Sequence, residues 1–264
     1  MKLTICDQLL DYLRCFLDHF KIPFTLIIAL TQTKPISGNP DVNIEGQLAL
    51  IRQAVAASAG LVVFPELSIT GYEPRQASKL AYPQDHEVFN AFQQAADESG
   101  TTIITSTPLS KKPGITISLL IFQPQKPMQV YSKQYLHADE EPYFISERTN
   151  YLLDLPDQIG LAICYELSLD EHFHTYADQS LDIYLASTAK EASGVRKAQE
   201  RMSDLARKNQ LITLMVNSIG PCDGVVCAGR SAAWDRRGNL IGELPADREG
   251  ILLVDTLKAT TETR

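Results

Sequence analysis

Short apolar runs rich in β-branched residues alternate with helical patterns along most of the chain, and this alternation limits the folds that it can adopt. Several of the runs are apolar enough to be buried on both faces of a sheet. The runs that predict strands are residues 24–30, 61–64, 101–106, 115–122, 160–164, 181–185 and 211–216. Their alternation with helices predicts an α/β fold in which helices cover the outer faces of the sheets.

Ala-rich or amphipathic segments between these runs predict helices. These segments are residues 43–58, 87–99, 170–177 and 192–208. Residues 115–130 and 231–255 instead indicate consecutive strands joined by turns that contain Gly or Pro. No linker, repeat or low-complexity segment interrupts residues 25–264, so we expect them to form one domain.

The first 24 residues have helical spacing of their own. Their apolar positions are Leu9, Leu13, Phe16 and Phe20. Acidic residues interrupt the run, which excludes a signal segment or a membrane span, and an acidic polar face does not suit a membrane surface. We expect residues 1–24 to be an amphipathic helical extension that packs on the body or on a neighbouring subunit.

Composition restricts the partners and the compartment. With 44% hydrophobic and 21% charged residues, the chain has the balance of an ordinary globular protein. Its net charge of -8, without a basic cluster, argues against nucleic acid as a partner. The five cysteines fit neither a disulfide framework nor a zinc site, so we expect a reducing, cytoplasmic setting.

The stretch LVVFPELSITGYEP places Glu66 directly after an apolar strand, and a turn at Gly71 and Tyr72 follows. A carboxylate at such a strand end lies where clefts open in α/β sheets, and burial there would raise its pKa toward that of a usable base. Glu66 could equally cap the next turn. On this stretch alone both interpretations stay open.

The stretch VYSKQYLHADEEPYF places Lys133 after a short strand-like run, and Glu141 follows eight residues later. A protonated lysine in a cleft beside carboxylates can stabilise an oxyanion as it forms. A solvated lysine at a surface edge is the more common case for any single lysine.

The stretch GLAICYEL places Cys164 at a predicted strand-to-helix junction. Backbone N–H groups and the helix dipole at such a junction lower the pKa of a thiol and can hold an anion. Taken singly, a cysteine after an apolar run is more often an inert core residue.

Glu66, Lys133 and Cys164, in this order and each at a strand end, resemble the Glu-Lys-Cys triad of the nitrilase (carbon-nitrogen hydrolase) superfamily. FPEL with GY resembles its glutamate motif, YSKQYL followed by Glu141 resembles its lysine motif with an additional glutamate, and GLAICYE resembles its cysteine motif. The resemblance extends from about Ile27 to the segment GILLVDT near the C-terminus. It implies a four-layer α-β-β-α sandwich, commonly paired into a homodimer through its outer helices.

The resemblance also implies roles for these residues. Glu66 would act as general base, and Cys164 would attack an amide or nitrile carbon to form a thioester or thioimidate. Lys133 and the backbone N–H of Tyr165 would stabilise the oxyanion. Glu141 would orient Lys133 or the substrate amine. No metal or organic cofactor is implied.

Substrate contacts are predicted less sharply. Tyr72 in the glutamate motif and Tyr165 are candidates. The segment STAKEAS brings Lys190 and Glu191 near the expected pocket, where many members have Asn-Pro, so Lys190 could bind a charged substrate group or be a solvated loop residue. The segment ELSLDEH also replaces an Arg-Phe-Pro-Glu run that many amidases have after the cysteine.

The histidines and remaining cysteines have simpler interpretations. His172 and His174 lie two apart on a predicted helix, so they cannot readily share a metal and are expected at the surface. His137 lies in the lysine motif, where the lysine and glutamates explain the pattern better than a Cys-His hydrolase would. Cys222 and Cys227 are expected to be buried or loop thiols.

Together these features predict a thiol-dependent hydrolase that cleaves a small linear carboxamide, an ω-amide or a carbamoyl compound, and releases ammonia. A nitrilase acting on a small nitrile begins with the same attack and stays open. A binding or scaffold protein that keeps the fold without turnover is the third possibility, although all three triad positions are filled. The lipid-acylating branch is disfavoured because no membrane-spanning segment is present.

Overall fold

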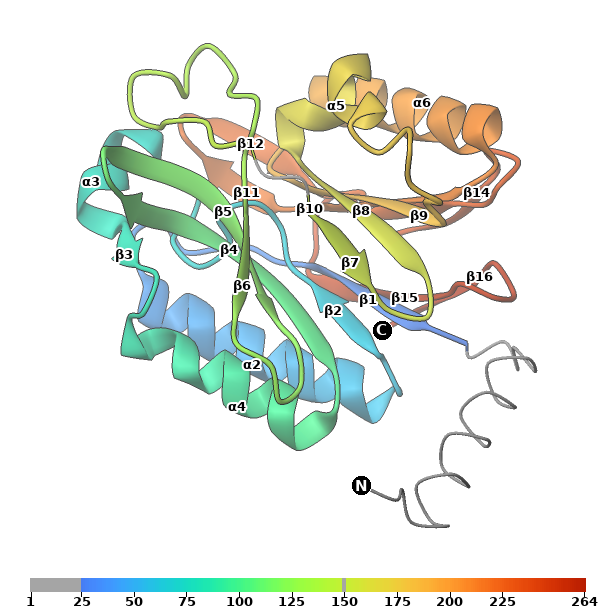
Figure 1. Cartoon of the computed structure of the whole chain (residues 1–264), viewed down its shortest axis with the longest axis horizontal. Helices are drawn as coiled ribbons and strands as arrows, with labels where there is room; N and C mark the ends of the chain where they lie inside the picture. The colour runs from blue at the N-terminus through green and yellow to red at the C-terminus, as the bar shows by residue number, and fades with distance from the viewer. Residues whose placement is uncertain (1–24, 149–150) are drawn as a thin grey trace, which may run out of the picture.

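The computed structural model describes residues 25–148 and 151–264, which form two sheets packed face to face between two layers of helices (Figure 1). Helices α2 (Pro40–Ala56) and α4 (Asn90–Ser99) cover one sheet, and α5 (Asp170–His174) and α6 (Ala192–Asn209) cover the other. The predicted four-layer α-β-β-α sandwich is confirmed. The predicted helical extension at residues 1–24 lies outside the described residues.

The larger sheet has eight strands in the order β16-β15-β1-β2-β4-β5-β6, with β3 beside β4. Strands β1, β2 and β4 run parallel, and the other neighbours on the main path are antiparallel. The strands are β1 (Ile27–Gln32), β2 (Leu61–Val63), β3 (Tyr82–Pro83), β4 (Thr102–Lys111), β5 (Gly114–Phe122), β6 (Gln129–Ser132), β15 (Gly250–Asp255) and β16 (Thr260–Thr263).

The smaller sheet has six strands in the order β14-β13-β10-β9-β8-β7, and β8, β9 and β10 run parallel. Its strands are β7 (Leu152–Asp154), β8 (Gln158–Ile163), β9 (Ile183–Thr188), β10 (Ile212–Asn217), β13 (Ala232–Trp234) and β14 (Leu240–Glu243). Strands β11 (Ile219–Cys222) and β12 (Val225–Ala228) form a separate hairpin.

The helices follow the predicted segments with shifted boundaries. Helix α2 begins with Pro40 in its first turn, where the missing N–H of proline is harmless, and the Asn39 side chain accepts a hydrogen bond from Val42 N–H. The predicted helix 87–99 divides into a 3-10 turn at Glu87–Phe89 and helix α4, and the predicted helix 170–177 ends at His174. A short helix α3 (Ala77–Leu80) was not predicted.

Apolar side chains fill three layers. The central layer lies between the sheets, where Leu30 and Ile104 of the larger sheet pack in one cluster with Leu161 and Leu185 of the smaller sheet. Of the two outer layers, one lies between the larger sheet and its helices, and the other lies between the smaller sheet and its helices. Because both faces of each sheet are buried, the central strands have the continuous apolar runs that the sequence shows.

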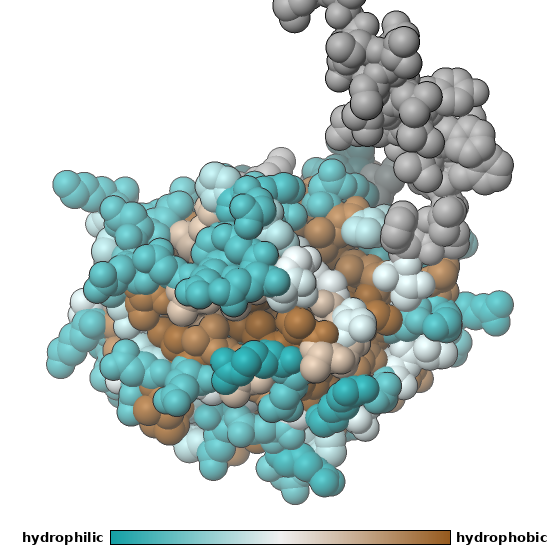
Figure 2. All heavy atoms as spheres, turned by 90° about the horizontal axis from the view of Figure 1, so that it is seen from below, coloured by the Kyte–Doolittle hydropathy of each residue, from teal (hydrophilic) through white to brown (hydrophobic). Residues whose placement is uncertain are grey.

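The outer surface over α2 and α4 is only partly polar. Figure 2 views the molecule from this side and shows hydrophobic residues in a band between hydrophilic margins. Val42 of α2 remains 45% exposed there. Contiguous apolar surface of this kind is typical of contacts with another molecule, and pairing of two copies through the outer helices stays a prediction.

The sheets bring several strand ends to one place between them. Lys133 follows the last residue of β6, Cys164 follows the last residue of β8, and Glu66 comes three residues after β2. The two sheets therefore deliver the three predicted residues from opposite sides of the central layer.

Candidate active site

The structure brings Glu66, Lys133 and Cys164 together. The Lys133 ammonium donates to Glu66 Oε1 at 2.8 Å, and both side chains are fully buried. Cys164 is partly exposed, lines the same cavity as Lys133, and interacts electrostatically with both Glu66 and Lys133. Three residues spread over nearly 100 positions of the sequence thus form one cluster.

The additional glutamate beside Lys133 is Glu140, so the prediction of Glu141 for this place is wrong by one residue. Glu140 Oε1 accepts hydrogen bonds from the Lys133 ammonium at 2.6 Å and from the Tyr72 hydroxyl at 2.8 Å. Its other oxygen accepts from His137 N–H at 2.8 Å. The turn from His137 to Glu140, closed by this hydrogen bond, directs Glu140 inward, whereas Glu141 is exposed.

Lys133 carries a positive charge in this environment. Burial alone would lower its pKa, but the negative charges of Glu66 and Glu140 raise the pKa above its ordinary value. Two of its three N–H donors are directed to these carboxylates, and Lys133 lines the cavity. One donor therefore remains for a group inside the cavity.

Glu66 keeps one oxygen available. Burial raises its pKa, and the Lys133 charge opposes that rise. Its Oε1 is bonded to Lys133, whereas its buried Oε2 has no hydrogen-bond partner among residues 25–148 and 151–264. A carboxylate with a raised pKa and a free oxygen is suited to accept a proton.

Cys164 adopts a backbone conformation that non-glycine residues rarely take. It directly follows strand β8 and begins the 3-10 helix Cys164–Ser168 with a φ of 44°. Such conformations are costly for residues with a Cβ and persist where the surrounding structure enforces them. The sharp turn presents the Cys164 thiol to the cavity.

The pKa of Cys164 is raised to about 11, which differs from the lowering expected at a helix N-terminus. Burial is the largest cause and the Glu66 charge adds to it, while Lys190, Lys133 and a backbone hydrogen bond from Ala189 oppose it. The helix at this junction is a five-residue 3-10 helix, which supplies little dipole. Cys164 is therefore a thiol at neutral pH and needs a base to become a nucleophile.

Glu166 links the segments that carry Lys133 and Cys164, a feature that the sequence did not predict. Its fully buried Oε2 accepts from Ile163 N–H at 2.7 Å and from the Tyr131 hydroxyl at 2.7 Å. Its Oε1 accepts from the backbone N–H groups of Gln134 and Tyr135. One carboxylate thus joins the end of β8 to the loop after β6.

His172 lies inside the protein, so its expected surface position is wrong. Its Nε2 lies 2.8 Å from the Tyr131 hydroxyl and its Nδ1 lies 2.9 Å from the Tyr184 hydroxyl. Because both ring nitrogens have partners, the ring can be fully buried. Burial lowers the pKa of His172 to about 4, so the ring is neutral near pH 7.

The cavity in front of Cys164 has a volume of about 450 Å³. The three predicted substrate contacts, Tyr72, Tyr165 and Lys190, all line it. The hairpin β11–β12 contributes Cys222 to its wall. Other ionisable residues of its lining are His137, Asp139, Glu191, Lys197 and Asp223.

Lys190 is held at the cavity by Asn217, which was not predicted as a site residue. Asn217 Oδ1 accepts from Lys190 N–H at 2.7 Å, and its side-chain amide donates to Lys190 O at 3.1 Å. The Lys190 charge lowers the pKa of both Cys164 and Glu66. Among the described residues, no carboxylate forms an ion pair with its ammonium.

Two further properties concern the described ranges as a whole. No group of three or more His, Cys, Asp or Glu side chains within residues 25–148 and 151–264 is arranged to hold a metal ion. In the same ranges, no helix has both the length and the apolar character that crossing a membrane requires.

Sequence comparison finds the family described as carbon-nitrogen hydrolase, whose sequence model matches residues 27–264. A glutamine-dependent NAD(+) synthetase from Synechocystis sp. is 27% identical over 261 residues, covering 86% of this chain and 45% of the synthetase. A nitrilase from Pyrococcus abyssi is 26% identical over 214 residues, covering 77% of this chain and 79% of the nitrilase. The chain spans less than half the length of the synthetases that it matches.

Comparison of structures finds the same fold. A double mutant of the amidase from Nesterenkonia sp. AN1, solved in complex with acrylamide, superposes with a TM-score of 0.80 at 23% identity. The match covers 88% of this chain and 90% of that chain. At this level of identity the likeness concerns the fold.

Proposed function

The chain belongs to the carbon-nitrogen hydrolase family, and from this premise we propose that it hydrolyses a small linear carboxamide, an ω-amide or a carbamoyl compound, through an acyl group on Cys164. The observation that carries the proposal is the buried Lys133 ammonium. It is bonded to Glu66 and Glu140 and lines the cavity to which Cys164 is exposed. A fixed positive charge beside a thiol and a base is suited to attack on a carbonyl carbon.

In the first half of the reaction, Glu66 takes the proton of the Cys164 thiol and the sulfur attacks the carbonyl carbon. The negative charge that develops on the substrate oxygen is stabilised by Lys133 and by the backbone N–H of Tyr165. The proton held by Glu66 passes to the departing nitrogen. Ammonia leaves, and a thioester on Cys164 remains.

In the second half, Glu66 takes a proton from water and the resulting hydroxide attacks the thioester carbon. The same oxyanion donors stabilise the second tetrahedral intermediate. The Cys164 sulfur leaves and recovers a proton from Glu66, which releases the acid and restores the thiol. Glu140 keeps Lys133 in place through both halves, the role first assigned to Glu141.

Lys190 indicates the character of the substrate's far end. Its ammonium lacks a carboxylate partner among the described residues and lies close enough to lower the pKa of Cys164. A substrate carboxylate would supply the missing partner. Glutamine, on which the related synthetases depend by name, is an ω-amide with such a carboxylate.

A nitrilase activity is the second candidate, favoured by the similarity to the Pyrococcus nitrilase. The same attack on a nitrile carbon gives a thioimidate, and water then gives the acid and ammonia. Both candidates need Cys164, Lys133 and Glu66, so the substrate has to separate them.

The experiment is ammonia release from a panel of ω-amides, carbamoyl compounds, neutral amides and nitriles. Ammonia from the ω-amides or carbamoyl compounds is expected with the wild-type chain. Cys164→Ala should abolish it, whereas Cys227→Ala, which changes a buried thiol that lines no part of the cavity, should retain it. A preference for carboxylate-bearing amides over neutral ones is expected from Lys190.

Activity that survives Cys164→Ala would remove Cys164 from the mechanism. Ammonia from nitriles alone would replace the amidase proposal with the nitrilase. No release from any member of the panel, together with a Cys164 that is alkylated no faster than the buried Cys227, would favour a scaffold without turnover.

A further inference from the structure

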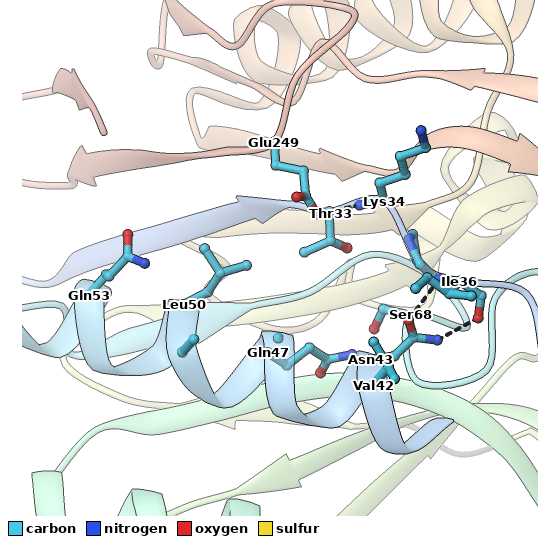
Figure 3. A pocket seen from close by; sticks show the side chains of 13 residues that line it. Thr33, Lys34, Ile36, Val42, Asn43, Gln47, Leu50, Gln53, Ser68 and Glu249 are labelled. Carbon is cyan, nitrogen blue, oxygen red and sulfur yellow. Dashed lines mark hydrogen bonds between the residues drawn. The ribbon is translucent and has the colours of Figure 1, made fainter. Parts of the chain in front are cut away.

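A second cavity of about 350 Å³ lies between the end of strand β1 and helix α2 (Figure 3). It shares no lining residue with the cavity at Cys164. Its apolar wall is formed by Pro35, Ile36, Val42 and Leu50. The cavity is therefore a separate place on the molecule, large enough for a small organic molecule.

Two polar groups of this cavity are buried without a partner. Thr33 is 7% exposed and Gln47 is 2% exposed, and neither Thr33 Oγ1 nor Gln47 Nε2 has a hydrogen-bond partner in the described ranges. Gln47 Oε1 accepts from the Thr105 hydroxyl at 2.6 Å, which leaves the nitrogen as the unpartnered end of the amide. Figure 3 shows them on two sides of the cavity, Thr33 directly after β1 and Gln47 on α2. Buried polar groups are costly without a partner, so this pair indicates a ligand.

The other buried polar side chains of the lining are already engaged. Asn43 Oδ1 accepts from Ile36 N–H, and its amide nitrogen donates to Ile36 O and Ile69 O. The Ser68 hydroxyl is bonded to Thr105. The Gln47 amide nitrogen and the Thr33 hydroxyl are therefore the groups left for a ligand.

The charged groups of the lining lie at its rim, where the Glu249 carboxylate extends toward Thr33 and is held by a backbone N–H (Figure 3). Lys34 and Glu249 lie exposed at its rim, where Lys34 N–H donates to Glu249 Oε1 at 2.8 Å. Figure 3 shows the Lys34 ammonium pointing away from Gln47. Because a buried ion needs a charged partner, these walls favour an uncharged ligand.

We propose that this cavity binds a small, uncharged primary carboxamide. Its carbonyl oxygen accepts from Gln47 Nε2, its NH₂ group donates to Thr33 Oγ1, and its alkyl group packs on Ile36, Val42 and Leu50. Binding is non-covalent and does not depend on Cys164, so this site stands apart from the proposed reaction.

The test uses the full chain with Cys164→Ala, so that the probe is not consumed, and follows the side-chain NH₂ signal of Gln47 by ¹H–¹⁵N NMR. The Gln47→Met variant identifies the signal by its loss. Titration with butyramide is expected to shift the signal saturably, and butyrate, of the same shape but charged, is expected to bind at least tenfold more weakly.

Thr33→Val should weaken butyramide binding at least tenfold, because the hydroxyl is replaced by a methyl group of similar size. Thr107→Val is the matched control, since the Thr107 hydroxyl is also buried and unpartnered among the described residues but lines neither cavity. It should leave binding unchanged. A Gln47 signal that does not move, equal binding of butyrate, or equal binding by Thr33→Val and Thr107→Val would overturn the proposal.

Discussion

The charge of Lys133 is balanced by two carboxylates, Glu66 and Glu140, and it opposes the rise in the pKa of Glu66 and of Cys164. Removing Lys133 would leave Glu66 and Glu140 buried without a counter-charge, at a cost of about 3–5 kcal/mol to folding. A variant of Lys133 would therefore lose stability as well as catalysis, and its activity would not separate the two effects. Glu140 is the more informative position to change.

Changing Glu140 to Gln should lower kcat by about 100-fold, because an amide oxygen can accept from Lys133 but no longer carries the charge that holds the ammonium in position. Glu141→Gln is the matched control, since the exposed neighbour differs by one position and should leave kcat unchanged. Steady-state ammonia release checks both variants. Equal effects at the two positions would remove Glu140 from the positioning of Lys133.

The two acids also show what the sequence can and cannot predict at this scale. The motif identifies a glutamate after Lys133, but Glu140 and Glu141 are chemically identical neighbours. The turn in which Glu140 N–H donates to His137 O decides which of them points inward. The raised pKa of Cys164 could not be predicted from the sequence either. It follows from burial and from the charge of Glu66, 98 positions earlier in the chain.

Among the elements, the turn after β8 depends on the loop after β6. Glu166 accepts hydrogen bonds from both, and burial raises its pKa to about 7 while donors such as Ile163 N–H oppose the rise. The predicted strands and helices of this region exist, but their apolar periodicity says nothing of a carboxylate that joins two loops. Glu166 joins the two loops through hydrogen bonds to Ile163, Gln134 and Tyr135.

Glu166→Gln should lower kcat about tenfold with KM little changed, since glutamine has one acceptor oxygen and leaves an N–H of Ile163 or Gln134 without its partner. The variant should also unfold at a lower temperature. Leu253→Ala, a buried position on β15 in an outer apolar layer, is the control that lowers stability without touching this junction. If both variants lose stability while both keep kcat, Glu166 has no part in positioning the site.

For the molecule as a whole, the alternation of apolar runs and helical segments predicts most of the central strands and the longer helices. The short strands β3, β7, β11, β12 and β16 were not predicted, because two to four residues rarely show a pattern of their own. The burial of His172 was missed because its partners, Tyr131 and Tyr184, lie on strands of different sheets. Such burial is a property of the assembled layers.

His172 makes the stability of the fold depend on pH. Its pKa is lowered from 6.5 to about 4, so the unfolded chain gains a proton first and stability falls as pH decreases through this window. Between pH 7 and pH 5 the wild-type chain should lose about 2 kcal/mol more unfolding free energy than His172→Gln, which does not titrate. Urea unfolding at the two pH values measures the difference.

The neighbouring Glu166 has the opposite effect on the unfolding free energy, because its raised pKa favours folding at low pH. Glu166 is present in both proteins, so its contribution to the pH dependence cancels in the comparison. An equal pH response of the two chains would show that His172 titrates normally in the fold.

In the proposed reaction, Cys164 carries the acyl group during turnover. The most direct measurement is mass spectrometry of the chain after acid quench within milliseconds of mixing with the best carboxamide of the panel. One acyl group is expected on the peptide that contains Cys164, removable by hydroxylamine and absent from Cys164→Ala. Ammonia release with an unmodified Cys164 at every quench time would contradict the proposed reaction.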